Sequence, residues 1–277
     1  MAAEKGTEAR EPRGTSQTAN RALVLLKLVA AAPGDGLRLA DIASEAGFDR
    51  ATAHRLLASL MQHAFIEQDP DSKRYRLGLE FFTLAAAASN RFDVTEVARA
   101  ALRRLSERTG DTSFFCLRSG SDLVCIDVET GTHPIKTLPL DVGSKRPIGL
   151  GSVGLAALAT LPESESELTL QRSGEKLAHH SGMSLKAYKA ELARARSAGY
   201  AILPEDDHQL MLGVAVALIN RRGRPQGTLS VTGLAELSTP ARLAEIAKHL
   251  TAEARSVEDS MWRLPEERRH RRRWKGE

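Results

Sequence analysis

Residues 49–57 read Asp49-Arg50-Ala51-Thr52-Ala53-His54-Arg55-Leu56-Leu57, and this stretch has the pattern of an amphipathic helix. Asp is favoured at a helix N-cap, so we expect the helix to begin directly after Asp49. Apolar residues at spacings of three and four predict a buried face formed by Ala53, Leu56, Leu57, Leu60 and Met61. The opposite side carries Arg50, Ala51, His54, Arg55 and Ala58. The segment therefore predicts a helix with one buried side and one exposed basic side.

The flanking segments indicate the domain to which this helix belongs. The expected neighbours are helices at residues 20–32 and 39–46 and strands at residues 65–68 and 73–77. Pro33-Gly34 and Gly47 end the helices, and the turn sequence Asp69-Pro70-Asp71-Ser72 joins the strands. Three helices followed by a hairpin are typical of a winged helix-turn-helix. We expect this domain at residues 17–78, after a disordered N-terminal tail at residues 1–16.

The exposed basic side of the third helix suits nucleic acid. In a helix-turn-helix, the recognition helix lies in the major groove and presents its first residues to base edges. Arg50 and Arg55 can donate to phosphates or to guanine O6 and N7, and small residues between them allow a close approach. The candidate DNA-binding residues are Arg21, Arg50, Ala51, Thr52, His54, Arg55, Lys73, Arg74 and Arg76. The alternative is that these are ordinary surface charges, and their placement on one helix face and one hairpin favours DNA.

The remainder of the chain alternates strands and helices. Residues 79–92, rich in Leu, Phe and Ala, predict a linker helix, and Asp93 with Glu96 predicts a capping box for the next helix, which Gly110 ends. The expected strands are at residues 113–118, 123–128, 134–140, 213–219 and 226–232. The further expected helices follow residue 149, occupy residues 185–197 and begin at Thr239-Pro240. Residues 93–262 therefore predict an α+β domain with a mainly antiparallel sheet.

Composition limits the class of protein. An apolar fraction of 42 % and a charged fraction of 27 % belong to a globular chain. The longest apolar run, Leu210–Ile219, is shorter than the roughly 18 residues of a membrane helix, and residues 1–16 lack the apolar stretch of a secretory signal. We therefore expect a cytoplasmic protein with no membrane partner. The net charge of +4 lies entirely in a basic C-terminal tail at residues 263–277, which is either a solvated end or a binding arm.

Residues that carry chemistry are sparse. Cys116 and Cys125 flank a predicted turn and would face each other across a hairpin, either as two reduced thiols or as a disulfide. His133 and His179-His180 lack companions at metal-ligand spacing, so we interpret them as surface residues and expect no metal. Residues 149–154 lack the Gly-Lys-Ser/Thr of a phosphate-binding loop, and the chain has no G-x-S-x-G elbow. We therefore expect no catalytic residues, no cofactor and no enzyme.

Motifs in collinear order over residues 17–262 resemble the IclR family of bacterial transcriptional regulators. The resemblance lies in the ordered set rather than in any single motif. The motifs are Asn20-Arg21-Ala22-Leu23, Asp49 to Leu57, Arg74-Tyr75-Arg76-Leu77-Gly78, Val97 to Leu105, Thr109-Gly110-Asp111-Thr112, Arg146-Pro147-Ile148, Gly199-Tyr200-Ala201 and Gly227 to Gly233.

This resemblance implies an N-terminal winged helix-turn-helix that dimerises with the help of the linker helix, and a C-terminal GAF-like α/β domain that binds a small effector. It also implies homodimers that can pair into tetramers on palindromic operators. Members of the family act as repressors, as activators or as both, and their effectors are often organic acids or aromatic catabolites.

The residues of the family's effector pocket can be assigned to this chain only by matching positions. The matching residues are Ser152, Val153, Leu203, Gly213, Ser230 and Thr232. Leu203 stands where the family pattern usually has an acidic or polar residue, and Gly213 where it often has Cys. Because polar anchors are missing and burying a carboxylate without donors costs several kcal/mol, we expect an effector larger or more apolar than a two- or three-carbon acid. The alternative is that Ser230 and Thr232 merely line a packed core.

The function predicted from the sequence is a DNA-binding transcriptional regulator, a repressor or a dual regulator, whose operator binding is controlled by a catabolic metabolite such as an organic or aromatic acid. Two alternatives come from other classes of protein. One is an enzyme that uses the winged helix for protein interaction, and the other is a structural or ligand-sensing oligomer. Binding to a DNA operator would distinguish a transcriptional regulator from both alternatives.

Overall fold

The computed structural model describes residues 16–32, 34–89, 94–133, 139–205 and 209–261. The chain forms two compact units, Met1–Arg91 and Phe92–Glu277. Among the described residues, no helix is both long enough and apolar enough to cross a membrane. The basic tail at residues 263–277 and all of the N-terminal tail except Ser16 lie outside the described residues. Ser16 is the N-cap of the first helix, where its hydroxyl accepts a hydrogen bond from the Ala19 N–H.

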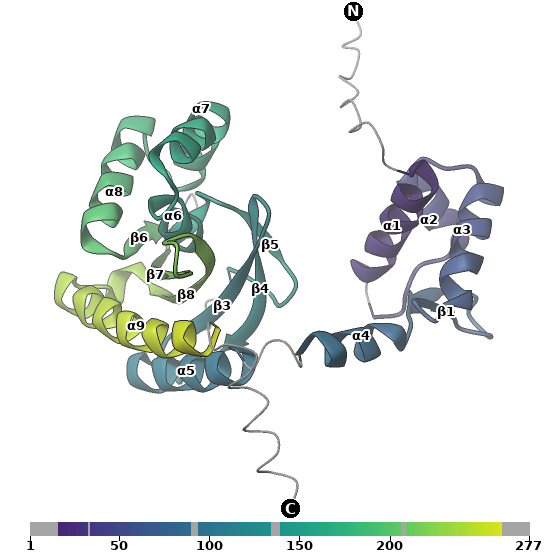
Figure 1. Cartoon of the computed structure of the whole chain (residues 1–277), viewed down its shortest axis with the longest axis horizontal. Coiled ribbons are helices and arrows are strands. Elements are labelled where there is room, and N and C mark those ends of the chain that lie inside the picture. The colour runs from purple at the N-terminus through teal and green to yellow at the C-terminus, as the bar shows by residue number, and fades with distance from the viewer. Residues whose placement is uncertain (1–15, 33, 90–93, 134–138, 206–208, 262–277) are drawn as a thin grey trace, which may run out of the picture. The chain divides into compact units, whose positions relative to one another are not determined.

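The first unit has three helices, a two-stranded hairpin and a fourth helix (Figure 1). Its elements are α1 (Gln17–Ala30), α2 (Leu39–Ala46), α3 (Arg50–Gln62), β1 (Ile66–Gln68), β2 (Tyr75–Leu77) and α4 (Glu80–Ser89). The bounds of α2 are as predicted, and the others differ by a few residues at their ends. Asp49 caps α3 as predicted: its Oδ1 accepts the Thr52 N–H at 2.8 Å, and hydrogen bonds from Thr52 lower the pKa of Asp49.

One apolar cluster holds the first unit together. Leu25, Ile42, Leu57 and Ile66 come from α1, α2, α3 and β1 and are almost fully buried. Tyr75 of β2 joins them and also pairs with Leu37 through an antiparallel bridge. The hairpin is therefore attached both to the helical core and to the segment that precedes α2.

The second unit places helices on both faces of one sheet (Figure 1). Its elements are α5 (Val94–Thr109), β3 (Thr112–Ser119), β4 (Asp122–Glu129), β5 (Lys145–Pro147), α6 (Gly151–Ala159), α7 (Glu163–His180), α8 (Leu185–Ala198), β6 (Ala201–Pro204), β7 (Met211–Ile219), β8 (Pro225–Leu234), the short 3-10 helix η1 (Ala235–Leu237) and α9 (Pro240–Met261). The strand order is β5-β4-β3-β8-β7-β6, and all neighbours are antiparallel, as predicted.

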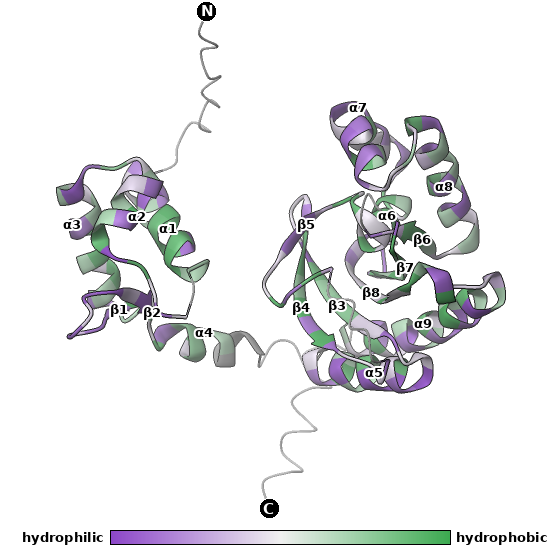
Figure 2. Ribbon diagram, turned by 180° about the vertical axis from the view of Figure 1, so that it is seen from behind, coloured by the Kyte–Doolittle hydropathy of each residue, from purple (hydrophilic) through white to green (hydrophobic). Residues whose placement is uncertain are grey.

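Each face of the sheet has its own core. One cluster joins α5 and α9 to apolar residues such as Phe115, Val214 and Val231. The other joins α6, α7 and α8 to residues such as Phe114 and Leu203. Figure 2 shows the resulting pattern, with strand β7 largely hydrophobic and the surrounding helices striped with hydrophobic and hydrophilic residues.

Four elements of the second unit were not predicted: β5, α7, β6 and η1. Helix α7 buries only Ser166, Gly174, Leu177 and Ala178, so it lacks the apolar period that indicates a helix. Strand β5 is three residues long and is charged, as edge strands often are. The strand predicted at residues 134–140 is not found at Pro139 and Leu140, and residues 134–138 lie outside the described part, as does Asp93 of the predicted capping box.

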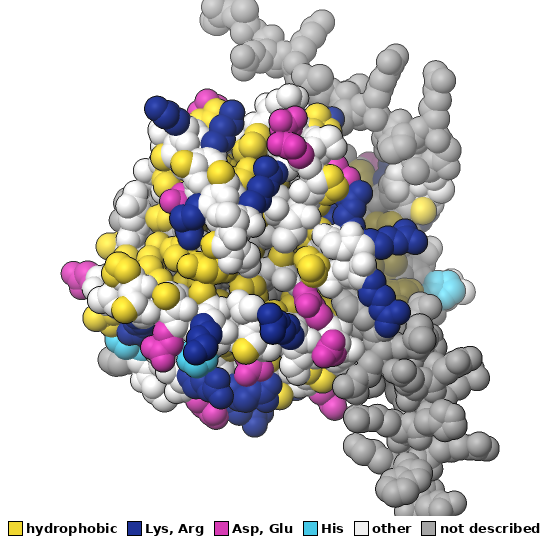
Figure 3. Space-filling model, turned by 60° about the vertical axis from the view of Figure 1, so that its left-hand side comes forward, with side chains coloured by type: hydrophobic (Ala, Val, Ile, Leu, Met, Phe, Trp, Pro, Cys, Tyr) yellow, Lys and Arg dark blue, Asp and Glu magenta, His cyan; other side chains and the backbone are white. Residues whose placement is uncertain are grey.

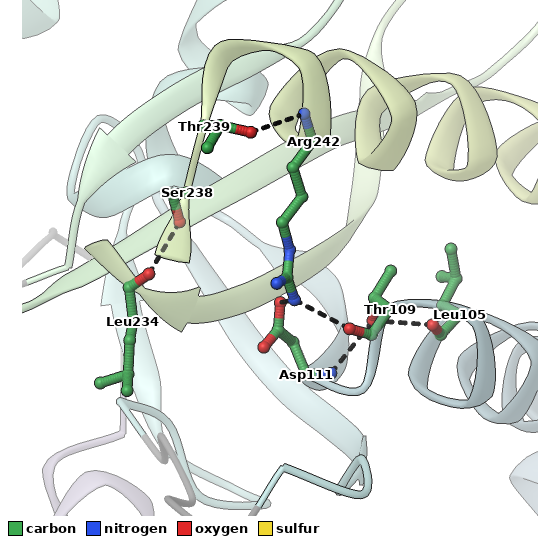
Figure 4. A network of polar contacts seen from close by, with 7 residues as sticks. All are labelled: Leu105, Thr109, Asp111, Leu234, Ser238, Thr239 and Arg242. Atoms are coloured by element: carbon green, nitrogen blue, oxygen red, sulfur yellow. Dashed lines mark hydrogen bonds and ion pairs between the residues drawn. The ribbon is translucent and has the colours of Figure 1, made fainter. Parts of the chain in front are cut away.

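A partly buried ion pair ties the start of α9 to the junction of α5 and β3 (Figure 4). Arg242 donates from Nη2 to Asp111 Oδ2 and to the Thr109 carbonyl, both at 2.8 Å. Thr109 in turn donates to the carbonyl of Leu105 in α5. Burial raises the pKa of Asp111, whereas the charge of Arg242 opposes that rise. Arg242 therefore offsets part of the cost of burying this carboxylate and joins two elements that are distant in sequence.

Replacing Arg242 with Ala should lower the free energy of unfolding by about 1–3 kcal/mol at neutral pH, because Asp111 stays buried but loses the guanidinium that binds it. A raised carboxyl pKa favours the folded state at low pH, and that advantage is lost as the pH rises through the folded-state pKa. Urea unfolding should therefore show a smaller loss near pH 4 than near pH 7. The exposed Lys248→Ala on the same helix is the control. An equal loss at both pH values would contradict this role of the pair.

Candidate DNA-binding surface and buried polar site

The exposed face of α3 carries the predicted recognition residues. Arg50, Ala51, His54 and Arg55 are exposed, and α3 contains no Asp or Glu. Neither Arg50 nor Arg55 forms a side-chain hydrogen bond or ion pair with another described residue. Thr52 differs from these four because it is half-buried and donates its N–H to the cap Asp49. The local sequence thus places two unengaged guanidinium groups on one helix face.

Arg21 extends this basic surface from α1. Its guanidinium carbon lies 5.4 Å from the centre of the Phe48 ring, a cation–π distance. Phe48 directly precedes the N-cap of α3, so the contact places Arg21 beside the start of that helix.

The wing between β1 and β2 has a defined turn. Asp69 Oδ1 accepts hydrogen bonds from the N–H groups of Asp71 and Ser72 and from the Ser72 hydroxyl. These bonds from Ser72 lower the pKa of Asp69. Lys73 follows in a left-handed conformation with φ of 58°, and its side chain is exposed.

The other two predicted wing cations have structural partners. Arg74 donates to the carbonyl of Gly36 at 2.7 Å, and Arg76 donates to the carbonyl of Asp35 at 3.4 Å. Both residues are half-buried. They therefore attach the wing to the segment before α2, a role that their charge and spacing did not predict.

Lys73 allows stability and DNA binding to be separated. Lys73→Gly relieves the left-handed strain and should raise the free energy of unfolding by up to about 1 kcal/mol. If Lys73 contacts a phosphate, the variant should also bind operator DNA several-fold more weakly, and its log–log salt slope should be smaller by about 0.9. Lys73→Ala is the matched control, with the same loss of affinity but no gain in stability. Unchanged affinity for operator DNA in both variants would show that Lys73 is not part of the DNA-binding surface.

The sheet face that meets α6 is unusually small and polar. Along β8, Leu229 and Val231 point toward α5 and α9, so the alternation of a strand sends Ser230 and Thr232 the other way. Gly213 of β7 lies opposite Thr232 in the antiparallel register. All of these residues are buried. This face of β7 and β8 therefore presents hydroxyls and small residues, rather than large apolar side chains, to the helix above it.

A buried carboxylate occupies the space between this face and α6. Glu205 Oε1 accepts the Ser152 N–H at 3.1 Å and the Ser152 hydroxyl at 2.5 Å, and Arg146 Nη1 donates to Oε2 at 2.5 Å. The side chain of Glu205 is 1 % exposed and that of Arg146 is 10 % exposed. Arg146, Ser152, Glu205, Gly213 and Ser230 are called the buried polar site below.

The structure brings most of the predicted effector residues together here. Ser152 binds Glu205 directly, Leu203 pairs with Gly213 across β6 and β7, and Thr232 faces Gly213 from β8. Val153 follows Ser152 in α6 and is buried in the same helix-facing core. Ser230 lies on the same sheet face, two residues from Thr232. Every one of these residues is buried, so a ligand could enter only if some of them move.

Sequence reasoning missed Glu205 and Arg146. It inferred from Leu203 and Gly213 that polar anchors are absent, but Arg146 and the Ser152 N–H are strong anion donors. These donors are already taken by Glu205. The Arg146-Pro147-Ile148 motif and the charged residue after Leu203-Pro204 were visible in the sequence, but nothing in it showed that they meet.

Ser230 has a buried hydroxyl that makes no hydrogen bond to any described residue. Its neighbours across the strands are Phe114 and Ala215, neither of which offers a side-chain partner. A buried hydroxyl without a partner costs about 1–3 kcal/mol, so the position favours a polar group that is supplied from elsewhere. This observation favours a binding role for Ser230 over a purely packed core.

Two buried serines on adjacent strands give a matched test. Ser113→Ala removes a hydroxyl that donates to the Leu102 carbonyl and should lower the free energy of unfolding by about 0.5–1.5 kcal/mol. Ser230→Ala removes an unsatisfied hydroxyl and should leave the stability of the unliganded protein unchanged or increased. Thermal unfolding of both variants measures this. A loss at Ser230 equal to that at Ser113 would mean that the Ser230 hydroxyl is satisfied.

The two cysteines are free thiols. Cys116 and Cys125 are paired across β3 and β4, as predicted, and both are buried. The neighbouring Cys125 and burial raise the pKa of Cys116, so its thiol stays protonated at neutral pH. His179 is exposed as predicted, but His180 is half-buried, and its Nε2 has no partner among the described residues. No group of side chains within the described part of the chain has the makeup of a metal site.

A separate groove lies at the edge strand β6. Its volume is about 450 Å³, and Tyr200, Ile202, Leu212 and Leu243 line it together with residues of α8. Figure 3 shows hydrophobic side chains gathered on this face. Arg194 forms part of the lining, 5.7 Å from the centre of the Tyr200 ring and paired with Glu191. The groove is open, whereas the buried polar site is closed.

A helix-turn-helix with an exposed basic third helix, joined to an α/β unit, is an architecture of DNA-binding transcriptional regulators. The family model described as the IclR helix-turn-helix domain matches residues 18–70, and the model described as the bacterial transcriptional regulator IclR C-terminal matches residues 86–259. The chain belongs to the IclR family of bacterial transcriptional regulators.

Individual relatives agree with this assignment. The chain is 28 % identical to the HTH-type transcriptional regulator XynR of Escherichia coli over 237 residues, which cover 84 % of this chain and 92 % of the relative. It is 27 % identical to the transcriptional repressor IclR of Escherichia coli over 250 residues, or 88 % and 89 % of the two chains. These relatives are named as regulators rather than as enzymes, in agreement with the prediction that the chain is not an enzyme.

Solved structures share the fold. An IclR transcriptional regulator from Alicyclobacillus acidocaldarius has a TM-score of 0.77 at 24 % identity, covering 89 % of this chain and 99 % of that one. An IclR homologue from Microbacterium hydrocarbonoxydans, complexed with 4-hydroxybenzoate, has a TM-score of 0.73 at 20 % identity, covering 88 % and 99 %. The fold class is therefore an N-terminal winged helix-turn-helix followed by a C-terminal α/β domain, as predicted.

Proposed function

We propose that this regulator is a repressor that binds a palindromic operator in the cytoplasm and is controlled by a small effector. The exposed face of α3 carries the proposal, because neither Arg50 nor Arg55 on this face has a side-chain partner in the part of the chain that the structure describes. The proposed domains are the winged helix-turn-helix at residues 17–78, the linker helix at residues 79–92 and the effector domain at residues 93–262. Curated relatives named as repressors support the repressing mode.

Self-association is the second part of the proposal. Helices α1 and α4 expose large apolar side chains that a monomer would leave in water: Leu23, Val24, Phe82 and Leu84, with Leu79 just before α4. Burying such a surface against a second copy is favourable. A two-fold dimer would place two recognition helices about one DNA turn apart, on the order of 34 Å, or at a multiple of that spacing.

Effector control is the third part. The Ser230 hydroxyl, which has no partner among the described residues, supports a ligand beneath the sheet, and a solved relative holds 4-hydroxybenzoate. We propose a catabolic metabolite larger or more apolar than a two- or three-carbon acid. The effector would shift operator affinity only by its different affinities for the DNA-competent and DNA-incompetent arrangements of the dimer.

Arg55→Ala tests the DNA-binding surface. The variant should remain folded and should bind its operator more weakly by about 1–3 kcal/mol if Arg55 reads a base. Gel shifts on DNA next to the protein's own coding region, together with circular dichroism, measure both properties. Arg196→Ala removes the same charge from an exposed position on α8 and should leave affinity unchanged. Unchanged affinity in a folded Arg55→Ala would refute this reading face, and the absence of any operator would favour an enzyme or a structural oligomer.

A further inference from the structure

We infer that Glu205 is a built-in carboxylate that fills the anion-binding position at the N-terminus of α6 and thereby excludes small exogenous carboxylates from the site. Glu205 is then a specificity-determining residue, and the part of the ligand that lies beside Glu205 is uncharged. The inference about ligand class rests on the proposed effector function, but the occupancy of the position by Glu205 does not.

The contacts of Glu205 are those that a bound carboxylate would make. The first N–H groups of a helix have no partner within the helix and carry partial positive charge, so they attract anions. Here the Ser152 N–H donates to Oε1, the Ser152 hydroxyl donates to the same oxygen, and Arg146 donates to Oε2. Arg146 is held in place by a second bond to the Pro139 carbonyl at 3.0 Å. Both carboxylate oxygens are therefore engaged by fixed donors.

Two glycines make room for this carboxylate. A Cβ atom at Gly213 would overlap Glu205 Oε1 and the Ser152 hydroxyl. A Cβ atom at Gly151 would lie 2.6 Å from both Glu205 Oε2 and Arg146 Nη1, and Gly151 also has a φ of 65°. Glycine at these two positions therefore leaves the space that the Glu205 carboxylate occupies, and a side chain at either position would block it.

The Ser230 hydroxyl is an independent sign of a ligand at the same place. Ser230 is 1 % exposed, its hydroxyl has no partner among the described residues, and it lies diagonally across from Gly213 on the same sheet face. The charge of Arg146 is already paired with Glu205. The group that this part of the site offers to a ligand is therefore the neutral hydroxyl of Ser230. A hydroxyl, amide or similar neutral group satisfies it, and an acidic effector would have to place its carboxylate elsewhere.

Removing the built-in carboxylate should create a site for a free one. Glu205→Ala deletes Cγ, Cδ and both oxygens, which together match the heavy atoms of acetate. The deletion leaves Arg146 buried without its counter-ion, so the variant should be less stable than the wild type. Acetate can restore the same three hydrogen bonds, and a ligand that binds only the folded state raises the unfolding temperature.

The experiment compares thermal unfolding of the full chain in sodium acetate and in sodium chloride at equal ionic strength. Glu205→Ala should show an acetate-dependent rise of about 3–6 °C once acetate is at about ten times its dissociation constant, and the wild type should show none. Glu205→Gln keeps the position filled and should also not respond. Glu191→Ala removes a half-exposed carboxylate that pairs with Arg194 and is the matched control.

The outcomes are decisive in either direction. A rise confined to Glu205→Ala supports the inference, whereas an equal rise in the wild type, or none in any variant, overturns it. If Glu205→Ala aggregates in chloride, recovery of folded protein only in acetate supports the inference, and aggregation in both salts overturns it. The unfolding experiment contains no DNA. Its result therefore stands even if the gel shifts show that the protein binds no operator.

Discussion

The alternation of side chains along β7 and β8 is the constraint on which the second unit depends. Because neighbouring side chains point to opposite faces, Val214, Leu229 and Val231 all pack against α5 and α9. The same register sends Gly213 and Ser230 toward α6. A shift of one residue would exchange the two sets, exposing hydroxyls to the apolar core and filling the polar site with aliphatic side chains. The stability of one face and the chemistry of the other are thus set together.

The buried polar site contains an ion pair between Arg146 and Glu205. A buried ion pair is weak evidence for stability, because removing two charges from water offsets much of their attraction. The pair of Arg146 and Glu205 is better understood as a device that joins segments. It connects strand β5 and the first turn of α6, which are neighbours in the chain, to Glu205 directly after β6, more than 50 positions away. Any ligand that enters beneath the sheet must compete with these contacts or adapt to them.

Much of the fold could be predicted from local signals, since these act within a few residues. Asp49, Gly47 and Gly199 mark helix ends through caps that need no tertiary contact. The hairpin of Cys116 and Cys125 follows from its turn. Helix α7 and strand β5 could not be found in this way, because α7 buries few apolar residues and β5 is a short charged edge. Arg74 and Arg76 looked like free cations, yet they bond to carbonyls about 40 residues away.

The sequence by itself determined the helix-turn-helix, the two-unit organisation, the antiparallel sheet and the basic face of α3, because periodicity, caps and turns are encoded by neighbouring residues. Only the tertiary structure decided that Glu205 reaches Ser152 and Arg146, and that Gly213 leaves it room. The contacts of Glu205 with Arg146 and Ser152 join residues more than 50 positions apart. Their existence depends on how strands and helices pack, and no local pattern in the chain records that packing.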